Sequence, residues 1–558
     1  MFWEGLAVPF DASAAADTFP KLLIRNAHLY GSRPSMRHKD LGVWQTWTWS
    51  EVLEIVRAYA VGLHRLGLKR GETIAIVGSN RPKLYWSVMA AQMLGAVPVP
   101  VYADAVADEL SFVLAHADVR YAAVEDQEQI DKIQSVMERL PKLERMVYDE
   151  ARGLRDYDHA HLRSMNDVIA DGRKALAEDP SVGVWLDAEI AASKGSDPSI
   201  ILYTSGTTGF PKGAVSTHSA VCQSLMAFAS GAAIQSARRG PEEAGSGLAP
   251  CFILIVPLFH VTGCIPVMMS CFAWHFKLVM MYRWEPERAL QLIERHRVTS
   301  FVGVPTQSWD LLESPNFATY DTSSLTSVGG GGAPAPSKLV ARVASSFSRG
   351  GPTLGYGMTE TNAYGPGNYG DDYVTHPTST GRTPTIVMDV EIRDENMKTL
   401  STMQSGEIWM KSPTTIRCYW QKPEETAKAL MNGWLRTGDL GHIDDEGYLY
   451  VEDRLKDMIL RAGENVYCAE VESAIYENPN VYEAAVFGIA NERLGEEVAC
   501  VVKLKPGARL TEDELHTYLA SRLASFKIPT RVAFTNEPLP RNPAGKFLKR
   551  EMPALYFS

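Results

Sequence analysis

The chain has few cysteines, seven in 558 residues, and no two of them form a CxxC pair. This spacing excludes a zinc ribbon and gives no disulfide framework, so we expect free thiols in a reducing compartment. A repeat of about 20 to 50 residues and low-complexity tracts are also missing, which excludes solenoid and propeller arrays.

The chain has fewer basic than acidic residues: 55 Lys and Arg against 66 Asp and Glu, which gives a net charge of -11. That balance argues against nucleic acid or an anionic membrane as the main partner, so an anionic ligand needs a local positive cluster. The N-terminus lacks the basic start of a secretory signal. No charged residue lies between Glu243 and Lys277, but three prolines interrupt that stretch, which predicts buried strands and helix in a cytoplasmic protein.

The length predicts about three to four structural units, and helices and strands alternate from Thr48 onward. Thr48 and Glu51 form a capping box that opens a helix ending at Gly67. Strand, helix and strand are then expected over residues 73–78, 84–94 and 96–101. This alternation predicts parallel α/β layers.

We predict two domains and a subdomain. The large N-terminal lobe, residues 1–453, is expected to hold the layered α/β sheets, with a small β subdomain between Val390 and Val451 where short strands and turns dominate. Residues 454–558 have an apolar pattern of their own, with a capping box at Thr511 and Glu514 for a last helix ending near Leu523. A smaller, mobile α+β domain is expected there.

The most informative segment is YTSGTTGFPKGA, residues 203–214. It combines glycines, which bring backbone N–H groups close to an anion, with hydroxyl groups and one lysine, and contains no acidic residue. It is not a Walker A loop, because only two residues lie between Gly206 and Gly209, where that loop has four, and Lys212 precedes a glycine. Alone, such a run is more often a polar surface loop; four further motifs favour a phosphate-binding loop.

These motifs are GYGMTET at 355–361, WLRTGDLG at 434–441, DRLKDMILRAGEN at 453–465 and PRNPAGK at 540–546. Together and in this order they resemble the adenylate-forming superfamily of acyl-CoA synthetases, luciferases and peptide-synthetase adenylation domains. The resemblance covers nearly the whole chain. It implies an enzyme that uses ATP, Mg²⁺ and coenzyme A to join a small-molecule carboxylic acid to a thiol, with homodimer formation left open.

The resemblance also implies roles for individual residues. Tyr356 would stack on adenine, Asp439 and Arg454 would hold the ribose, and Glu360 would bind Mg²⁺ with Thr204. His260 in PLFH would lie beside the acyl carboxylate as a positioning and gating residue. The remaining nucleotide-binding residues are expected to be Ser205, Gly206, Thr207, Thr208, Gly209, Lys212, Gly332, Ala333, Pro334, Gly355, Gly357, Met358 and Thr359.

Lys546 is the residue expected to carry the first chemical step. A carboxylate that attacks an α-phosphate brings two anions together, and a cation touching both lowers their repulsion. Lys456 occupies the family's hinge position, and Gly463 matches the glycine that lines the pantetheine channel, where a side chain would obstruct the thiol. Ala462 replaces a glycine common in relatives.

The acid is expected to be a medium- or long-chain fatty acid, because DRLKDMI and the first hundred residues resemble long-chain synthetases and small apolar residues surround the expected pocket. These residues are Val261, Cys264, Gly303, Val304, Gly330 and Gly331. The same residues could shape a flat slot for an aryl acid. An adenylating enzyme that loads a separate carrier protein, and an inactive binding protein that keeps the fold, are further alternatives.

Overall fold

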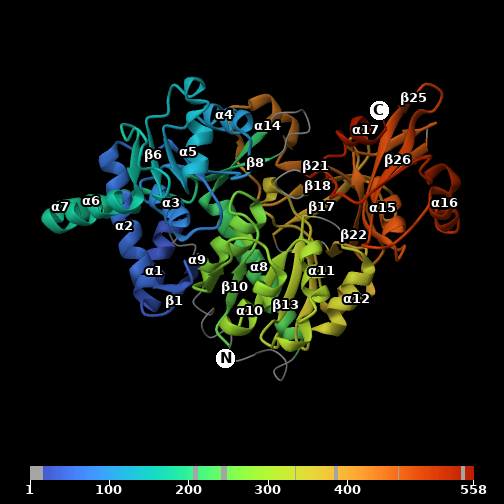
Figure 1. Cartoon of the computed structure of the whole chain (residues 1–558), viewed down its shortest axis with the longest axis horizontal. Coiled ribbons are helices and arrows are strands. Elements are labelled where there is room, and N and C mark those ends of the chain that lie inside the picture. Colours follow the sequence, from blue (N-terminus) through green and yellow to red (C-terminus); the bar gives the residue numbers. More distant parts are fainter. Residues whose placement is uncertain are drawn as a thin grey trace.

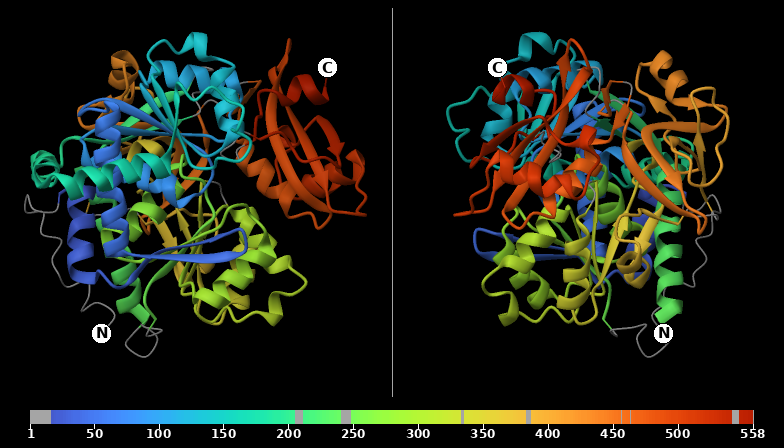
Figure 2. Two further views of the ribbon diagram at one scale, coloured as in Figure 1. Left: turned by 60° about the vertical axis from the view of Figure 1, so that its left-hand side comes forward. Right: turned by 90° about the vertical axis from the view of Figure 1, so that its right-hand side faces the viewer.

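The computed structural model describes residues 17–204, 211–239, 248–332, 335–382, 387–455, 457–462, 464–541 and 547–557. The expected positions Ser205 to Gly209, Ala333, Pro334, Lys456, Gly463 and Lys546 lie outside these ranges. Figure 1 shows the described elements as two bodies of unequal size, with α15, α16, β25 and β26 set to one side of all earlier elements. The left-hand view in Figure 2 shows the same separation.

The first sheet is parallel throughout, as the alternating pattern predicts. Its strands, in spatial order, are β4 (Val97–Val101), β3 (Thr73–Val77), β5 (Tyr121–Val124), β6 (Arg145–Tyr148) and β7 (Leu162–Ser164). The helices around it are α1 (Phe19–Tyr30), α2 (Trp49–Leu66), α3 (Pro82–Met93), α4 (Ala107–His116), α5 (Gln127–Gln134), α6 (Met165–Glu178) and α7 (Pro180–Ala192).

Helix α2 confirms the capping box. Thr48 accepts from the Glu51 amide while the Glu51 carboxylate accepts from the Thr48 amide, and the helix stops where Gly67 takes φ 111°. Its apolar positions Val52, Val56 and Tyr59 are fully buried, so the helix is held by its core face and ends where a glycine permits a left-handed turn. Helix α3 is buried along its whole length, which is why its sequence shows little periodicity.

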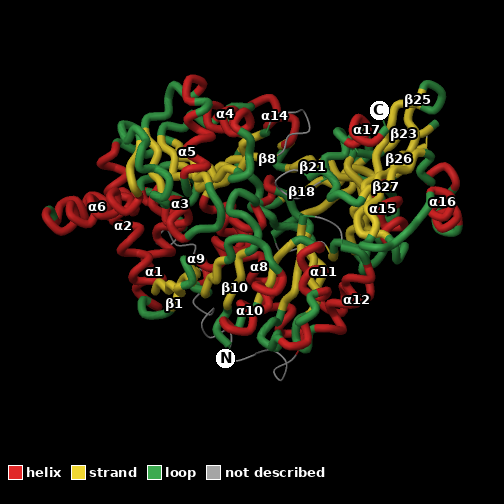
Figure 3. Tube along the Cα trace, in the orientation of Figure 1, coloured by secondary structure: helices red, strands yellow, loops and turns green. Residues whose placement is uncertain are grey.

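The second sheet is the largest and has a parallel centre. The parallel strands, in spatial order, are β14 (Gly351–Gly355), β13 (Ser327–Gly331), β12 (Ser300–Gly303), β10 (Cys251–Leu254), β11 (Lys277–Met280) and β1 (Pro34–Asp40), with β2 (Val43–Thr48) antiparallel at the edge. Associated helices are α8 (His218–Arg239), α9 (Ser270–Trp274), α10 (Pro286–His296), α11 (Pro305–Glu313), α12 (Ser337–Ser346) and α13 (Gly370–Thr375). Figure 3 separates these helices from the strands by colour.

The expected β subdomain is the antiparallel end of this sheet. It contains β15 (Gly367–Tyr369), β16 (Gly381–Arg382), β17 (Asp389–Arg393), β18 (Gly406–Lys411), β20 (Leu430–Met431), β21 (Trp434–Ile443) and β22 (Tyr448–Arg454). Strand β16 pairs with β22 and so joins these strands to the parallel centre. The subdomain therefore shares its hydrogen-bonding ladder with the large lobe.

Three antiparallel strands make a small third sheet: β8 (Pro198–Thr204), β9 (Lys212–Thr217) and β19 (Cys418–Tyr419). The short helix α14 (Pro423–Ala429) follows β19. The uncharged stretch from Glu243 to Lys277 contains β10 and α9, as expected, and between them a π-helical turn over Gly263–Met269 that contains Pro266. Among the helices that the structure describes, none has the length and hydropathy needed to cross a bilayer.

The C-terminal residues form a separate sheet with its own core. Its strands are β23 (Ile459–Arg461), β24 (Glu464–Val466), β25 (Val481–Asn491), β26 (Gly495–Leu504) and β27 (Arg531–Thr535), with α15 (Cys468–Tyr476), α16 (Glu512–Ala520) and α17 (Met552–Tyr556). The capping box at Thr511 is confirmed, but α16 ends at Ala520 and a shorter helix, α17, follows it. The division between residues 453 and 454 stays a prediction. All seven cysteines are free.

Candidate active site

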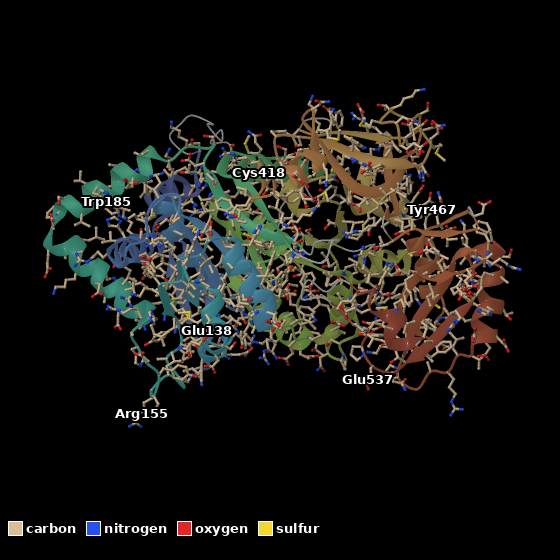
Figure 4. The ribbon with its side chains drawn as sticks, turned by 90° about the horizontal axis from the view of Figure 1, so that it is seen from above. Glu138, Arg155, Trp185, Cys418, Tyr467 and Glu537 are labelled. Carbon is tan, nitrogen blue, oxygen red and sulfur yellow. The ribbon has the colours of Figure 1, made fainter. Side chains whose placement is uncertain are left out.

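A large cleft lies where the main lobe meets the C-terminal residues. Its volume is about 3310 Å³, and both parts of the chain line it. Three parallel strands of the large sheet point their carboxyl ends at it, because Val304, Gly331 and Tyr356, at the ends of β12, β13 and β14, are among the lining residues. Ligands of open α/β sheets bind at this kind of edge. Seen from above in Figure 4, Tyr467 lies where the C-terminal part meets the main lobe and Trp185 lies at the far end of the molecule.

Glycine makes this edge of the sheet accessible. A Cβ on Gly355 or on Gly332 would meet no atom within 4 Å, and Gly332 takes φ 80°. Gly357 serves a different purpose, since a Cβ there would lie 2.4 Å from the Ala363 carbonyl oxygen. The adjoining residues Met358 and Thr359 also line the cleft.

Tyr356, Asp439 and Arg454 come together at one side of the cleft. Asp439 on β21 and Arg454 on β22 are direct partners in the antiparallel register, with the Arg454 Nε 3.5 Å from a carboxylate oxygen of Asp439. The Tyr356 hydroxyl donates to the other oxygen at 2.5 Å. Burial, with the Asp439 charge, raises the pKa of Tyr356 well above its usual value, so the phenol stays a donor. An aromatic face, a carboxylate acceptor and a guanidinium are thus gathered within one pocket.

The phosphate-loop residues Thr204 and Lys212 lie opposite each other, as the last residue of β8 and the first of β9. The Thr204 hydroxyl is 3.5 Å from the Lys212 carbonyl oxygen, and both residues line the cleft. The Lys212 ammonium forms an ion pair with Glu425 at 2.6 Å and lies 5.1 Å from the centre of the Tyr419 ring. The pair depresses the pKa of Glu425 to about 2, mainly through the hydrogen bond from Lys212 and then that from Lys428.

Glu360 lies in a 3-10 turn over Thr359–Thr361 and is buried at the wall of the cleft. Its carboxylate accepts a hydrogen bond of 2.6 Å from the Tyr419 hydroxyl. No cluster of three or more His, Cys, Asp or Glu forms a metal-binding group in the described ranges. A single buried carboxylate fits Mg²⁺, which keeps water and substrate phosphates as most of its ligands.

His260 lines the cleft on the side of the π-helical turn. Its Nδ1 accepts from the Thr262 amide at 3.2 Å, so the neutral ring carries its proton on Nε2. Of the small residues expected at the pocket, Val261, Val304, Gly330 and Gly331 line the cleft. Cys264 does not, because it is fully buried in the N-terminal core, and Gly303 packs against the side chain of Gln307.

Part of the cleft lining is apolar. Its aromatic and aliphatic side chains come from α8, β10, β12 and the segment around α9: Phe228, Ala229, Ala232, Phe252, Pro266, Trp274, Phe276 and Val302. Helices and sheet strands of the large lobe therefore both contribute to this apolar lining.

Tyr419 and Glu425 are site residues that the sequence patterns missed. Both belong to the β19–α14 segment, which has no glycine-rich motif of its own, and they meet Glu360 and Lys212 only through tertiary contacts. Ala462 takes φ 53°, in the left-handed region that favours glycine, which agrees with the expectation from the family resemblance that a glycine is common at this position.

Two family models match the chain. The model described as "AMP-binding enzyme" matches residues 23–420, and "AMP-binding enzyme C-terminal domain" matches residues 470–546. FadD13, a long-chain-fatty-acid–CoA ligase of Mycobacterium tuberculosis, is 33% identical over 506 residues, which cover 90% of this chain and 92% of the relative. A feruloyl-CoA synthase of an Amycolatopsis species is 31% identical, with 95% and 97% of the two chains covered.

Solved structures show the same likeness. The o-succinylbenzoate CoA synthetase of Bacillus subtilis, in complex with its acyl-adenylate intermediate, has a TM-score of 0.78 and 25% identity, with 95% of this chain and 97% of that one covered. A Mycobacterium tuberculosis fatty acyl CoA synthetase has a TM-score of 0.71 and 28% identity, with 97% and 98% covered.

Proposed function

The chain belongs to the AMP-binding enzyme family, and we propose from this that it activates a medium- or long-chain fatty acid as an acyl adenylate and transfers the acyl group to coenzyme A. It is an AMP-forming acid–thiol ligase that uses ATP, Mg²⁺ and coenzyme A. The observation that most supports the fatty acid is the apolar part of the cleft lining, which includes Phe228, Phe252 and Trp274.

We assign the nucleotide to the pocket of Tyr356, Asp439 and Arg454. Adenine would stack on the tyrosine ring, and the Asp439 carboxylate, already oriented by its two neighbours, would accept from the ribose hydroxyls. Thr204, Lys212 and Thr359 would contact the phosphates. Mg²⁺ held by Glu360, with Thr204 beside it, would neutralise phosphate charge. The residues of the loop outside the described ranges, Ser205 to Gly209, are assigned to the same phosphates.

In the first half-reaction a carboxylate oxygen of the acid attacks the α-phosphorus, the bond to the β-phosphate breaks, and pyrophosphate leaves. Lys546 would touch both anions and stabilise the charge that develops between them. In the second, the thiolate of coenzyme A attacks the acyl carbon, the carbon–oxygen bond to AMP breaks, and AMP leaves. Rotation of residues 454–558 about Lys456 would then withdraw Lys546 from the nucleotide and bring the pantetheine channel at Gly463 to it.

A ladder of acids tests the substrate class. Pyrophosphate release is measured with fatty acids of two to eighteen carbons. Its kcat/KM should rise with chain length, because each buried methylene contributes about 0.8 kcal/mol until the apolar part of the cleft is filled. Benzoate and cinnamate types serve as the comparison. Activity confined to the aromatic acids would contradict the proposal and favour an aryl-acid CoA ligase, and release of AMP without free coenzyme A would favour a carrier protein.

The ion pair between Lys212 and Glu425 bears on how ATP binds. Glu425 holds the Lys212 ammonium at 2.6 Å and offsets its positive charge, so less of that charge is available to a phosphate. Glu425 therefore competes with the nucleotide for the lysine. Removing the negative charge of Glu425 would leave the Lys212 ammonium available before ATP arrives.

Glu425→Gln should lower the KM for ATP about two- to fivefold, because a partly exposed ion pair contributes about 1 kcal/mol or less. The matched control is Glu424→Gln, since Glu424 is the preceding residue of α14 and is exposed. Steady-state kinetics at varied ATP would measure both. A raised KM in the Glu425 variant, or equal shifts in the two, would contradict this competition.

We also propose a cytoplasmic location from the seven free cysteines. Formation of a homodimer stays a prediction, which sedimentation of the purified protein would test.

A further inference from the structure

Two glutamates, Glu483, which is buried, and Glu472, which is partly buried, contact the residues that flank 542–546. Glu483 on β25 is 8% exposed, and its carboxylate accepts from the Arg541 guanidinium at 2.9 Å and from the Leu539 amide at 3.2 Å. Glu472 on α15 pairs with the Lys549 ammonium at 2.7 Å. The same Glu472 oxygen accepts from the Val486 amide of β25 at 2.8 Å. One glutamate thus fixes the chain before the segment and the other fixes it after.

The two flanks are also tied to each other. Arg541 and Phe547 form an antiparallel β-bridge, the Leu548 amide donates to the Pro540 carbonyl at 2.9 Å, and the Arg541 guanidinium lies 4.1 Å from the centre of the Phe547 ring. Leu539 and Met552 anchor these residues in the apolar cluster against β25 and β26. Arg541 and Phe547, the described residues that border 542–546, are therefore held against each other.

The charges at both flanks are maintained by pairing with a group of opposite charge. Burial works to lower the pKa of Lys549, but Glu472, Cys468 and Asp453 together raise it above its usual value, so the ammonium stays charged. Breaking such a pair leaves a buried charge without its counter-charge, which is costly. All four members, Glu472, Glu483, Arg541 and Lys549, belong to residues 454–558 and would move with them as one unit.

We propose that Glu483 and Glu472 are positioning residues for the first half-reaction, acting through Arg541 and Lys549 to hold the described chain on both sides of Lys546. This inference rests on the proposed function of Lys546. It gives two residues that line the same cleft, but are not among those assigned to the nucleotide, a defined influence on one half of the reaction, because only adenylation needs Lys546 in place.

The test compares half-reactions in Glu483→Gln, which keeps an acceptor for the Leu539 amide but loses the ion pair with Arg541. Acid-dependent pyrophosphate release should fall about 10- to 100-fold, the cost of misplacing a reacting group by about 1 Å. Thioester formation from synthetic acyl adenylate and coenzyme A should stay within about threefold, in line with a group that is not used there. Glu472→Gln should likewise slow adenylation and leave thioester formation nearly unchanged, so the test can still be made if one of the two variants fails to fold.

Glu497→Gln is the matched control. Glu497 on β26 pairs with Arg531 at 3.6 Å in the same sheet but does not contact the flanks of Lys546. It should change neither half-reaction by more than about twofold, as for an ordinary surface ion pair. If Glu483→Gln lowered the rates of adenylation and thioester formation equally, the inference would be overturned. The same holds if the Glu497→Gln control lowered adenylation alone as strongly as Glu483→Gln does.

A double variant separates positioning from a general structural effect. If Glu483 acts through Lys546, adding Glu483→Gln to Lys546→Ala should not slow adenylation further. A further loss as large as in the single variant would show that Glu483 acts independently and would overturn the inference. If Lys546→Ala alone does not separate the two halves, the assignment of Lys546 fails instead, so the two failures can be told apart.

Discussion

Lys546→Ala should abolish adenylation while sparing thioester formation from preformed acyl adenylate. The physical reason is that Lys546 offsets the repulsion between the attacking carboxylate and the α-phosphate, and this repulsion exists only in the first half-reaction. Removing one such charge from a preorganised site costs about 100- to 1,000-fold in rate. Acid-dependent pyrophosphate release measures the first half, and release of AMP from synthetic acyl adenylate with coenzyme A measures the second.

Lys503→Ala is a suitable control for this experiment. Lys503 belongs to β26 of the same C-terminal sheet and lies 5.1 Å from the centre of the Tyr482 ring, with no part in the proposed chemistry. Its loss should leave both rates close to those of the unaltered enzyme. Equal loss of the two half-reactions in Lys546→Ala would contradict the assigned role.

Glu360→Gln should reduce adenylation about 100-fold or more, because the variant removes the carboxylate expected to hold Mg²⁺ against the phosphates. The glutamine keeps the size of the side chain and an acceptor for the Tyr419 hydroxyl. The Mg²⁺ concentration that gives half-maximal pyrophosphate release should rise in parallel. Titration of activity with Mg²⁺ at saturating ATP measures both effects.

Tyr419→Phe is the matched control for Glu360, since it removes the hydrogen bond to the carboxylate but leaves the charge. We expect a loss of only a few-fold, in keeping with one hydrogen bond of about 1 kcal/mol. A Glu360→Gln variant that shows an unchanged Mg²⁺ requirement would count against Glu360 as the metal ligand.

The local structure was predictable where short-range chemistry decides it. Thr48 and Glu51 predict the start of helix α2, because both hydrogen bonds of a capping box form within four residues. Gly67 predicts the end of the same helix. The parallel sheet around β3 follows from buried strands that alternate with helices. Helix α17 and the π-helical turn around Pro266 escaped prediction, because one is short and the other breaks the usual helical rules.

The candidate site was predictable only in part. Asp439 and Arg454 were paired by resemblance, and the structure adds the reason, which is their cross-strand register. Glu425 and Tyr419 could not be found from the sequence, because their partners Lys212 and Glu360 are brought to them by the packing of separate segments. Glu472 and Glu483 could not be found from the sequence either, because their spacing along the chain does not predict their contacts with Lys549 and Arg541.

The most direct test of the account is isotope exchange between labelled pyrophosphate and ATP in the absence of coenzyme A. If the enzyme forms an acyl adenylate as a separate first step, a fatty acid and Mg²⁺ alone should support exchange, and the acid should be strictly required. Exchange that needs coenzyme A, or that proceeds without any acid, would contradict the two-step mechanism.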